Sequence, residues 1–264
     1  TNHKKLDFLA AKAKFYMQDY VTSSKYMNQF VTKSKISSGQ YPEPMMVESL
    51  SILIASLFNQ NKKIIVLLTR QHPPETTGYY AFQSFLSTIL DGSELSDVFL
   101  KTYRIIAFPI ANPDGVDLGH WRHNYGGIDL NRDWSVYNQP EIKQIVKFIN
   151  TASEDDEGDI ILGLDFHSTT KDVFYTNKKR DNTSMPNFID YWFAGLERNI
   201  PGYKVNESSG NSQEPVSKGW FLYGHNAVGV TYEIGDATPK EDIVIKGQVS
   251  AKEMMKILVY IIKP

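Results

Sequence analysis

The sequence has no cysteine among its 264 residues. Disulfide bonds and thiolate metal ligands are therefore excluded, and any metal ion must be bound by histidine, aspartate or glutamate. Long apolar runs are also missing, since the longest candidate, residues 254–262, is interrupted by Lys256. A formal net charge of -2 gives no general attraction to nucleic acid. These absences predict a globular protein with neither a membrane nor a nucleic-acid partner.

The length and the apolar content predict one domain. A chain of 264 residues with 41% hydrophobic residues can form one large α/β domain, and no linker or internal repeat divides it. We therefore expect a single domain over residues 1–264. The chain starts at Thr1 rather than methionine, which leaves room for an upstream segment. A cytoplasmic location is favoured, with the periplasm and secretion left open.

Amphipathic stretches alternate with short apolar runs along the chain. We expect helices at residues 6–21, 77–90, 139–151, 186–199 and 242–262, and strands at 26–36, 45–53, 64–69, 103–110, 160–166 and 228–234. Asn-Pro-Asp-Gly at 112–115 is a turn sequence, and residues 154–158 read as an acidic loop. Continuous apolar strands between helices are typical of a sheet covered on both faces. The pattern predicts a single three-layer α/β/α domain with a mixed, mostly parallel central sheet.

Polar side chains that can bind metal ions follow three of the expected strands. His72 and Glu75 come after the first, Asp165 and His167 close the second, and Glu233 lies near the end of the third. Open α/β sheets bind ligands at the carboxyl ends of their strands, so these side chains should meet at one edge. Two prolines follow His72, which favours a turn that enters a helix at Glu75.

Two histidines and one glutamate are a common ligand set for zinc in a catalytic site, with the fourth position left for water. Such an ion polarises a carbonyl group and lowers the pKa of a bound water to about 7. A separate carboxylate is then needed as general base, a role worth about 10²–10⁴ in rate, and Glu233 is the candidate. Residues 121–134 supply arginine and asparagine side chains that can bind a carboxylate or stabilise an oxyanion.

With these motifs the chain resembles the M14 (carboxypeptidase A-like) family of zinc carboxypeptidases. Asn-Pro-Asp-Gly at 112–115 and Asp-Leu-Asn-Arg-Asp-Trp at 129–134 are most similar to the cytosolic carboxypeptidase branch. The similarity runs from about Lys25 to the C-terminus. The resemblance implies the zinc carboxypeptidase fold and one Zn²⁺ ion bound by His72, Glu75 and His167, with Glu233 as general base.

The resemblance also assigns roles within the arginine-rich stretch. Arg122 matches the arginine that helps to polarise the scissile carbonyl. Asn131 and Arg132 match the pair that holds the terminal carboxylate of the substrate. Asp129 matches a carboxylate that orients the first ligand histidine.

Three positions depart from the family pattern or are ambiguous. Pro74 stands where the family usually has glycine, so the ligand turn is expected to differ slightly. Lys218 falls at the specificity-pocket position and would favour an acidic C-terminal side chain, but a solvated surface lysine is an equal alternative. The family's mobile tyrosine has no match, because neither Tyr203 nor Tyr223 stands at its place.

The expected activity is removal of a C-terminal residue from a peptide. An alternative is a zinc deacylase of N-acyl amino acids, similar to the aspartoacylase and desuccinylase branch, which shares the ligand spacing and the Asn-Arg pair. The Asn-Pro-Asp-Gly string and the Asp133-Trp134 continuation favour the peptidase. A third alternative, a catalytically silent binding module, is disfavoured because every expected ligand and the base are present. The substrate is a peptide or an amino-acid conjugate, and the oligomeric state is not indicated.

Overall fold

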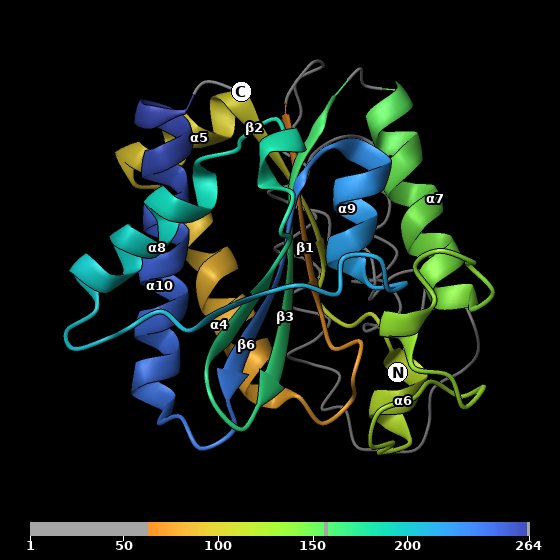
Figure 1. Ribbon diagram of the computed structural model, residues 1–264. Helices are drawn as coiled ribbons and strands as arrows, with labels where there is room; N and C mark the ends of the chain where they lie inside the picture. The colour runs from red at the N-terminus through yellow and green to blue at the C-terminus, as the bar shows by residue number, and fades with distance from the viewer. Residues whose placement is uncertain (1–62, 156–157, 263–264) are drawn as a thin grey trace, which may run out of the picture.

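The computed structural model describes residues 63–155 and 158–262 (Figure 1). A sheet runs through its centre in the order β2-β1-β3-β6-β4-β5. The strands are β1 (Lys63–Thr69), β2 (Tyr103–Phe108), β3 (Ile160–Thr169), β4 (Val173–Thr176), β5 (Glu207–Ser209) and β6 (Val228–Gly235). Strands β2, β1, β3 and β6 are parallel neighbours, and β4 pairs with β6 in the antiparallel sense. The prediction of a mixed, mostly parallel sheet is confirmed.

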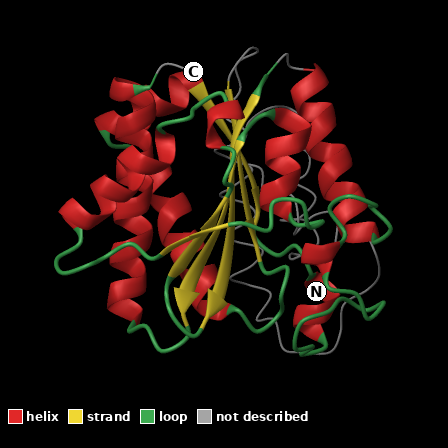
Figure 2. Cartoon of the chain, viewed as in Figure 1, coloured by secondary structure: helices red, strands yellow, loops and turns green. Residues whose placement is uncertain are grey.

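Helices cover both faces of this sheet (Figures 1 and 2). One layer contains α4 (Thr76–Ile89), α5 (Glu94–Thr102), α8 (Phe188–Asn199) and α10 (Lys240–Lys256), which continues into a π-helical turn, Ile257–Ile261. The other contains α6 (Pro113–Asp117), α7 (Pro140–Asp155) and α9 (Ser217–His225). Short 3-10 turns occur at Leu130–Arg132 and Arg180–Asn182. The three-layer α/β/α architecture is therefore confirmed.

The central strands β1 and β2 are mostly apolar, as expected for strands that are buried on both faces of the sheet. Ile65 and Leu67 of β1 belong to the core beneath α4, α5, α8 and α10, whereas Val66 and Leu68 belong to the core beneath α7 and α9. This alternation follows from the two-residue period of a strand. Burying a side chain of this size contributes about 1.5–3 kcal/mol, so the central strands form a rigid base for the residues at their ends.

Helix α9 lies close against β3 and β6 because glycines stand beneath it. A Cβ atom at Gly163 would lie 2.1 Å from the ring of Phe221, and one at Gly229 would lie 2.2 Å from the carbonyl oxygen of Lys218. Gly163 shares its face of β3 with Asp165 and His167, because successive side chains of a strand alternate between faces. The start of α9 is thereby brought next to the polar residues at the carboxyl ends of these strands.

Several predicted boundaries need correction. Strand β3 continues to Thr169 instead of ending at residue 166, because its polar end still pairs with β6. Asn-Pro-Asp-Gly begins helix α6 instead of forming a simple turn, and the Asn112 side chain accepts a hydrogen bond from Gly115 N at 3.0 Å. Helix α7 extends to Asp155, into the expected acidic loop, and β2 ends at Phe108. The elements expected at 6–21, 26–36 and 45–53 lie outside the described residues.

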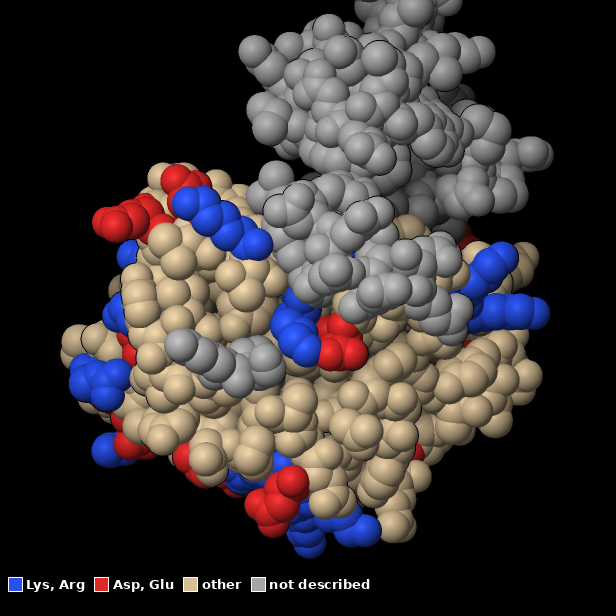
Figure 3. All heavy atoms as spheres, turned by 90° about the horizontal axis from the view of Figure 1, so that it is seen from above, with Lys and Arg blue, Asp and Glu red and all other residues tan. Residues whose placement is uncertain are grey.

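The described surface carries charges of both signs. In the view from above, acidic and basic side chains are interspersed among uncharged residues (Figure 3). Within residues 63–155 and 158–262, no helix combines the length and the apolar character that crossing a membrane requires.

Candidate metal centre and active site

The chain turns sharply where β1 ends. Arg70 has a φ of 58°, a left-handed conformation that costs a residue with a side chain about 1–2 kcal/mol. Two prolines follow His72, and Glu75 is the N-cap residue of α4, as expected. The turn brings His72 Nδ1 to 2.7 Å from Glu75 Oε1. Pro74 therefore does not prevent the two side chains from meeting.

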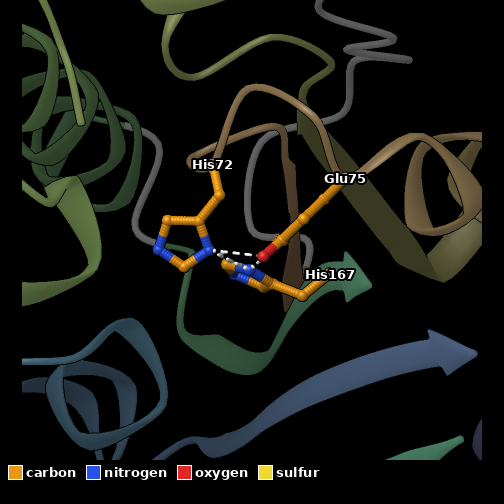
Figure 4. Close-up of side chains that lie close together, drawn as sticks. All are labelled: His72, Glu75 and His167. Atoms are coloured by element: carbon orange, nitrogen blue, oxygen red, sulfur yellow. Dashed lines mark hydrogen bonds and ion pairs between the residues drawn. The ribbon is translucent and has the colours of Figure 1, made fainter. Parts of the chain in front are cut away.

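His167 of β3 completes a cluster with these two residues (Figure 4). Its Nδ1 atom lies 2.7 Å from Glu75 Oε2 and 3.1 Å from His72 Nδ1. Both histidines are almost fully buried, with 4% and 1% of their surface exposed. Within the described part of the chain, this is the one group of three such residues whose donor atoms converge closely enough to hold a metal ion. The structure thus brings together the three predicted ligands.

The outer nitrogen of each histidine faces a carboxylate. His72 Nε2 lies 2.9 Å from Asp129 Oδ1, and His167 Nε2 lies 2.9 Å from Asp165 Oδ2; the second contact is at ion-pair distance but is not aligned as a hydrogen bond. A carboxylate at Nε2 favours the tautomer with its proton there, which leaves the lone pair on Nδ1. Two such lone pairs and the Glu75 carboxylate would repel one another unless a cation lies between them. The donor set therefore fits zinc.

The electrostatics of the metal-free cluster support this conclusion. Burial would raise the pKa of Glu75, but the charges and hydrogen bonds of His167 and His72 outweigh it and lower that pKa to about 2. Burial would lower the pKa of His167, yet Asp165 and Glu75 hold it well above its usual value. Both shifts show that a positive charge is favourable among these carboxylates.

Asp129 connects the cluster to the arginine-rich stretch. Its Oδ1 atom contacts His72 and also accepts a hydrogen bond from Asn131 N at 2.9 Å. Its Oδ2 atom accepts from Arg122 Nε at 2.8 Å. Although burial would raise the pKa of Asp129, the bonds from His72 and Arg122 hold it well below its usual range. The Asp129 carboxylate thus contacts both His72 and Arg122 and holds them close together.

Asn131 and Arg132 lie beside this carboxylate. The Asn131 side chain is buried, and its Oδ1 atom accepts a hydrogen bond from Ser217 N at 3.0 Å. Because the oxygen is occupied, the amide NH₂ is the group that can donate to a ligand. Arg132 is half-exposed, and its Nη1 atom donates to Asn131 O at 2.7 Å. Both residues therefore have side-chain N–H groups that could donate to a ligand.

Glu233 lies beside His167 on the neighbouring strand. The two residues are register partners in the parallel β3–β6 pair, so their side chains leave the same face of the sheet. Its Oε2 atom is buried and has no hydrogen-bond partner in the protein. Burial raises the pKa of Glu233 to about 7, against the opposing effect of His167. A carboxylate with these properties can take up and release a proton near neutral pH.

Lys218 is buried at the start of α9, with 4% of its surface exposed, so the surface-lysine alternative is wrong. Its Nζ atom donates to the carbonyl oxygens of Thr176, at 3.4 Å, and Gly210. Burial lowers the pKa of Lys218 to about 8, although Glu214 opposes this effect. Tyr203 is partly buried and Tyr223 is exposed on α9.

Two residues near the cluster had no role assigned from the sequence, although Asp165 was expected at this edge of the sheet. Asp165, which is fully buried, holds the outer nitrogen of His167, and Gln71 donates from its Nε2 atom to the same carboxylate. Gln71 Oε1 in turn accepts from Trp134 Nε1 at 2.8 Å. The sequence does place both residues close to the cluster. Asp165 stands two residues before His167, on the same face of the strand, and Gln71 directly precedes His72.

Known proteins resemble this chain in sequence and in fold. The family model "Zinc carboxypeptidase" (Peptidase_M14) matches residues 26–249. Cytosolic carboxypeptidase 2 of Xenopus tropicalis is 33% identical over 116 residues, which cover 42% of this chain and 12% of that protein. The chain thus spans about an eighth of the length of that curated relative. These names do not favour the deacylase alternative.

Solved structures share the fold at low identity. A metallo-carboxypeptidase from Burkholderia cenocepacia has a TM-score of 0.63 at 13% identity, covering 79% of this chain and 66% of that one. A metallo-carboxypeptidase from Pseudomonas aeruginosa, in complex with (2-guanidinoethylmercapto)succinic acid, has a TM-score of 0.59 at 16% identity and covers 81% and 67%. At such identities the likeness concerns the fold alone.

Proposed function

This chain belongs to the M14 family of zinc carboxypeptidases, and from that premise we propose that it hydrolyses the C-terminal peptide bond of a peptide substrate. The observation that carries the proposal is the convergence of His72 Nδ1, Glu75 and His167 Nδ1, with the buried carboxylate of Glu233 on the next strand. These positions support the proposal, because metal-assisted hydrolysis requires metal ligands and a base close together.

We assign one zinc ion to these three ligands. Zinc bound there would polarise the scissile carbonyl and acidify an attacking water. Asp129 and the carboxylate beside His167 Nε2 would keep both histidines in the ligand tautomer. This support around the ligands makes the site suitable for a permanently bound ion.

The remaining residues bind the substrate and move the proton. The Asn131 amide and the Arg132 guanidinium would hold the free carboxylate at the end of the peptide. Arg122 would stabilise the negative charge that develops on the carbonyl oxygen. Glu233 takes a proton from the attacking water as the new C–O bond forms, and it gives that proton to the amine nitrogen as the C–N bond breaks.

A preference for an acidic C-terminal residue is the finer part of the proposal. Among the described residues, no carboxylate lies within ion-pair distance of Lys218, whose Nζ atom contacts only backbone carbonyl oxygens. The charge of Glu214 acts on Lys218 without forming a direct ion pair, and an acidic side chain of the substrate would supply that direct partner. The start of α9, which bears Lys218, lies next to Asn131 through Ser217.

The proposal is tested with N-blocked dipeptides that end in glutamate, aspartate, alanine, leucine or phenylalanine. We expect release of the free C-terminal amino acid, loss of release with a chelator and its return on addition of zinc. Glutamate or aspartate should be released fastest. Chelator-insensitive hydrolysis would exclude the metal mechanism, and release of only the N-terminal blocking acid would identify a deacylase. Equal rates for all five peptides would remove the role of Lys218.

A further inference from the structure

Asp165 is a buried carboxylate that the proposed reaction does not use. It lies on β3, none of its surface is exposed, and its Oδ2 atom faces three side chains at once. His167 Nε2 lies 2.9 Å away, and Gln71 Nε2 and Ser217 Oγ both donate hydrogen bonds to the same oxygen. The other oxygen, Oδ1, is buried without a partner in the protein. Burying a carboxylate is costly unless ion pairs and hydrogen bonds compensate for its lost hydration.

The first contact concerns the metal. A negative charge at His167 Nε2 fixes the ring orientation and makes Nδ1 a stronger electron-pair donor. Asp129 does the same for His72 from the opposite side of the cluster. Each ligand histidine thus has its own carboxylate. The surroundings of the two carboxylates differ. Asp129 contacts half-exposed arginines, whereas Asp165 contacts only buried side chains.

The second contact leads to the residues that bind the substrate. Ser217 is fully buried at the first position of α9, and its hydroxyl is fixed on Asp165. The backbone N–H of Ser217 donates to Asn131 Oδ1 at 3.0 Å. This bond orients the Asn131 amide so that its NH₂ group is free for a ligand. The next residue along α9 is Lys218.

We propose that Asp165 is a positioning residue that joins metal binding to substrate binding, because one oxygen orients His167 and, through Ser217, the start of α9 and the Asn131 amide. The proposal rests on the assignment of His167 as a zinc ligand. It requires two effects from one side chain: a change in zinc affinity through His167, and a change in KM through Ser217. A residue with a merely structural role would lower the stability of the fold without this pair of effects.

The test uses the full chain in metal-free form and the variants Asp165→Asn, Ser217→Ala and His167→Ala. Asp165→Asn keeps the shape of the side chain and removes its charge. Ser217→Ala removes only the hydroxyl and keeps the backbone N–H that binds Asn131. Ser96→Ala is the matched control, since Ser96 is also buried and also uses its hydroxyl, on Ile89 O, but it lies on α5. Thermal unfolding of each metal-free variant shows that it is folded.

Zinc affinity is measured by competition with a chromophoric chelator, and KM is measured at saturating zinc with the blocked dipeptide that the wild type cleaves best. We expect Asp165→Asn to weaken zinc binding about 10- to 100-fold and to raise KM. Ser217→Ala should leave zinc affinity within about twofold of wild type and raise KM about two- to tenfold, the usual effect of one lost hydrogen bond. Ser96→Ala should change neither quantity.

Wild-type zinc affinity in a folded Asp165→Asn variant would overturn the role toward His167. An unchanged KM in Ser217→Ala would overturn the link to the substrate site. If Asp165→Asn does not fold, the KM of Ser217→Ala still tests the link from Asp165 through Ser217 to the substrate site, because it is measured on a separate variant. Failure of the proposed function has a different signature: the wild type would bind no zinc, or His167→Ala would bind it as tightly as the wild type.

Discussion

Replacement of Lys218 by methionine gives the sharpest test of substrate choice. Methionine has a similar length and suits a buried position, so Lys218→Met removes the charge and largely keeps the volume. The Nζ atom now contacts only the carbonyl oxygens of Thr176 and Gly210, with no carboxylate partner in the described part of the chain. An acidic side chain that enters this position would therefore gain its main charged contact from Lys218.

The size of the effect follows from that contact. A hydrogen bond to a charged group contributes about 1.5–3 kcal/mol. At 1.36 kcal/mol for each factor of ten, the loss in kcat/KM for a peptide ending in glutamate is about 10- to 150-fold. A peptide ending in alanine does not reach the lysine and should change less than about threefold. The specificity ratio should therefore fall by at least about one order of magnitude.

The assay compares kcat/KM for blocked dipeptides ending in glutamate and in alanine, measured side by side on wild type and variant. Lys246→Met is the matched control. Lys246 is another poorly exposed lysine, but it pairs with Asp172 at 2.6 Å from helix α10. This control should lower thermal stability and leave the glutamate-to-alanine ratio unchanged. An equal loss of both substrates in Lys218→Met would show that Lys218 supports the fold of α9 and does not select the substrate.

Three further predictions concern the base and the metal. Glu233→Gln should lower kcat about 10²- to 10⁴-fold while the zinc content, measured by elemental analysis, stays at the wild-type level; near-normal turnover would remove Glu233 as base. Burial raises the pKa of Glu233 to about 7, bound zinc would lower it from there, and the base acts when ionised, so kcat/KM should fall on the acid side, at a pH below 7. A kcat/KM that stays constant down to about pH 5 would contradict the assignment of Glu233 as base. Zinc should raise the melting temperature of the metal-free protein, because zinc at 1,000 times its Kd adds about 4 kcal/mol to the free energy of unfolding. A similar rise in melting temperature for His167→Ala would show that zinc binds elsewhere.

The sequence predicted the central strands and the cluster because these depend on local patterns. Residues 64–69 and 228–234 are apolar enough to be assigned to buried strands without tertiary information. His72 and Glu75 lie three residues apart in one turn, so their proximity was also a local property. His167 was placed just after a strand but lies inside one, because pairing with β6 extends β3 beyond its apolar part.

The parts that were missed depend on long-range contacts. Helix α9 has nine residues and contains two glycines, so it is a weak helix by sequence and is stabilised by packing on Gly163 and Gly229. The burial of Lys218 follows from that packing and could not be read from its neighbours in the chain. The role of Asp165 was hidden for the same reason, because its partners Gln71 and Ser217 are 94 and 52 residues away in sequence.

The pairing of His167 with Glu233 in neighbouring strands has a consequence for how this site can diversify. The separation between adjacent strands, about 4.8 Å, is set by backbone hydrogen bonds and is the same for every sequence. The spacing of β3, which carries His167, and β6, which carries Glu233, therefore does not depend on the residues that surround them. If the proposed function holds, substitutions and insertions in the segments that carry Arg122, Arg132 or Lys218 would alter which peptide is accepted while this spacing stays constant. Chemistry and selectivity can thus change independently.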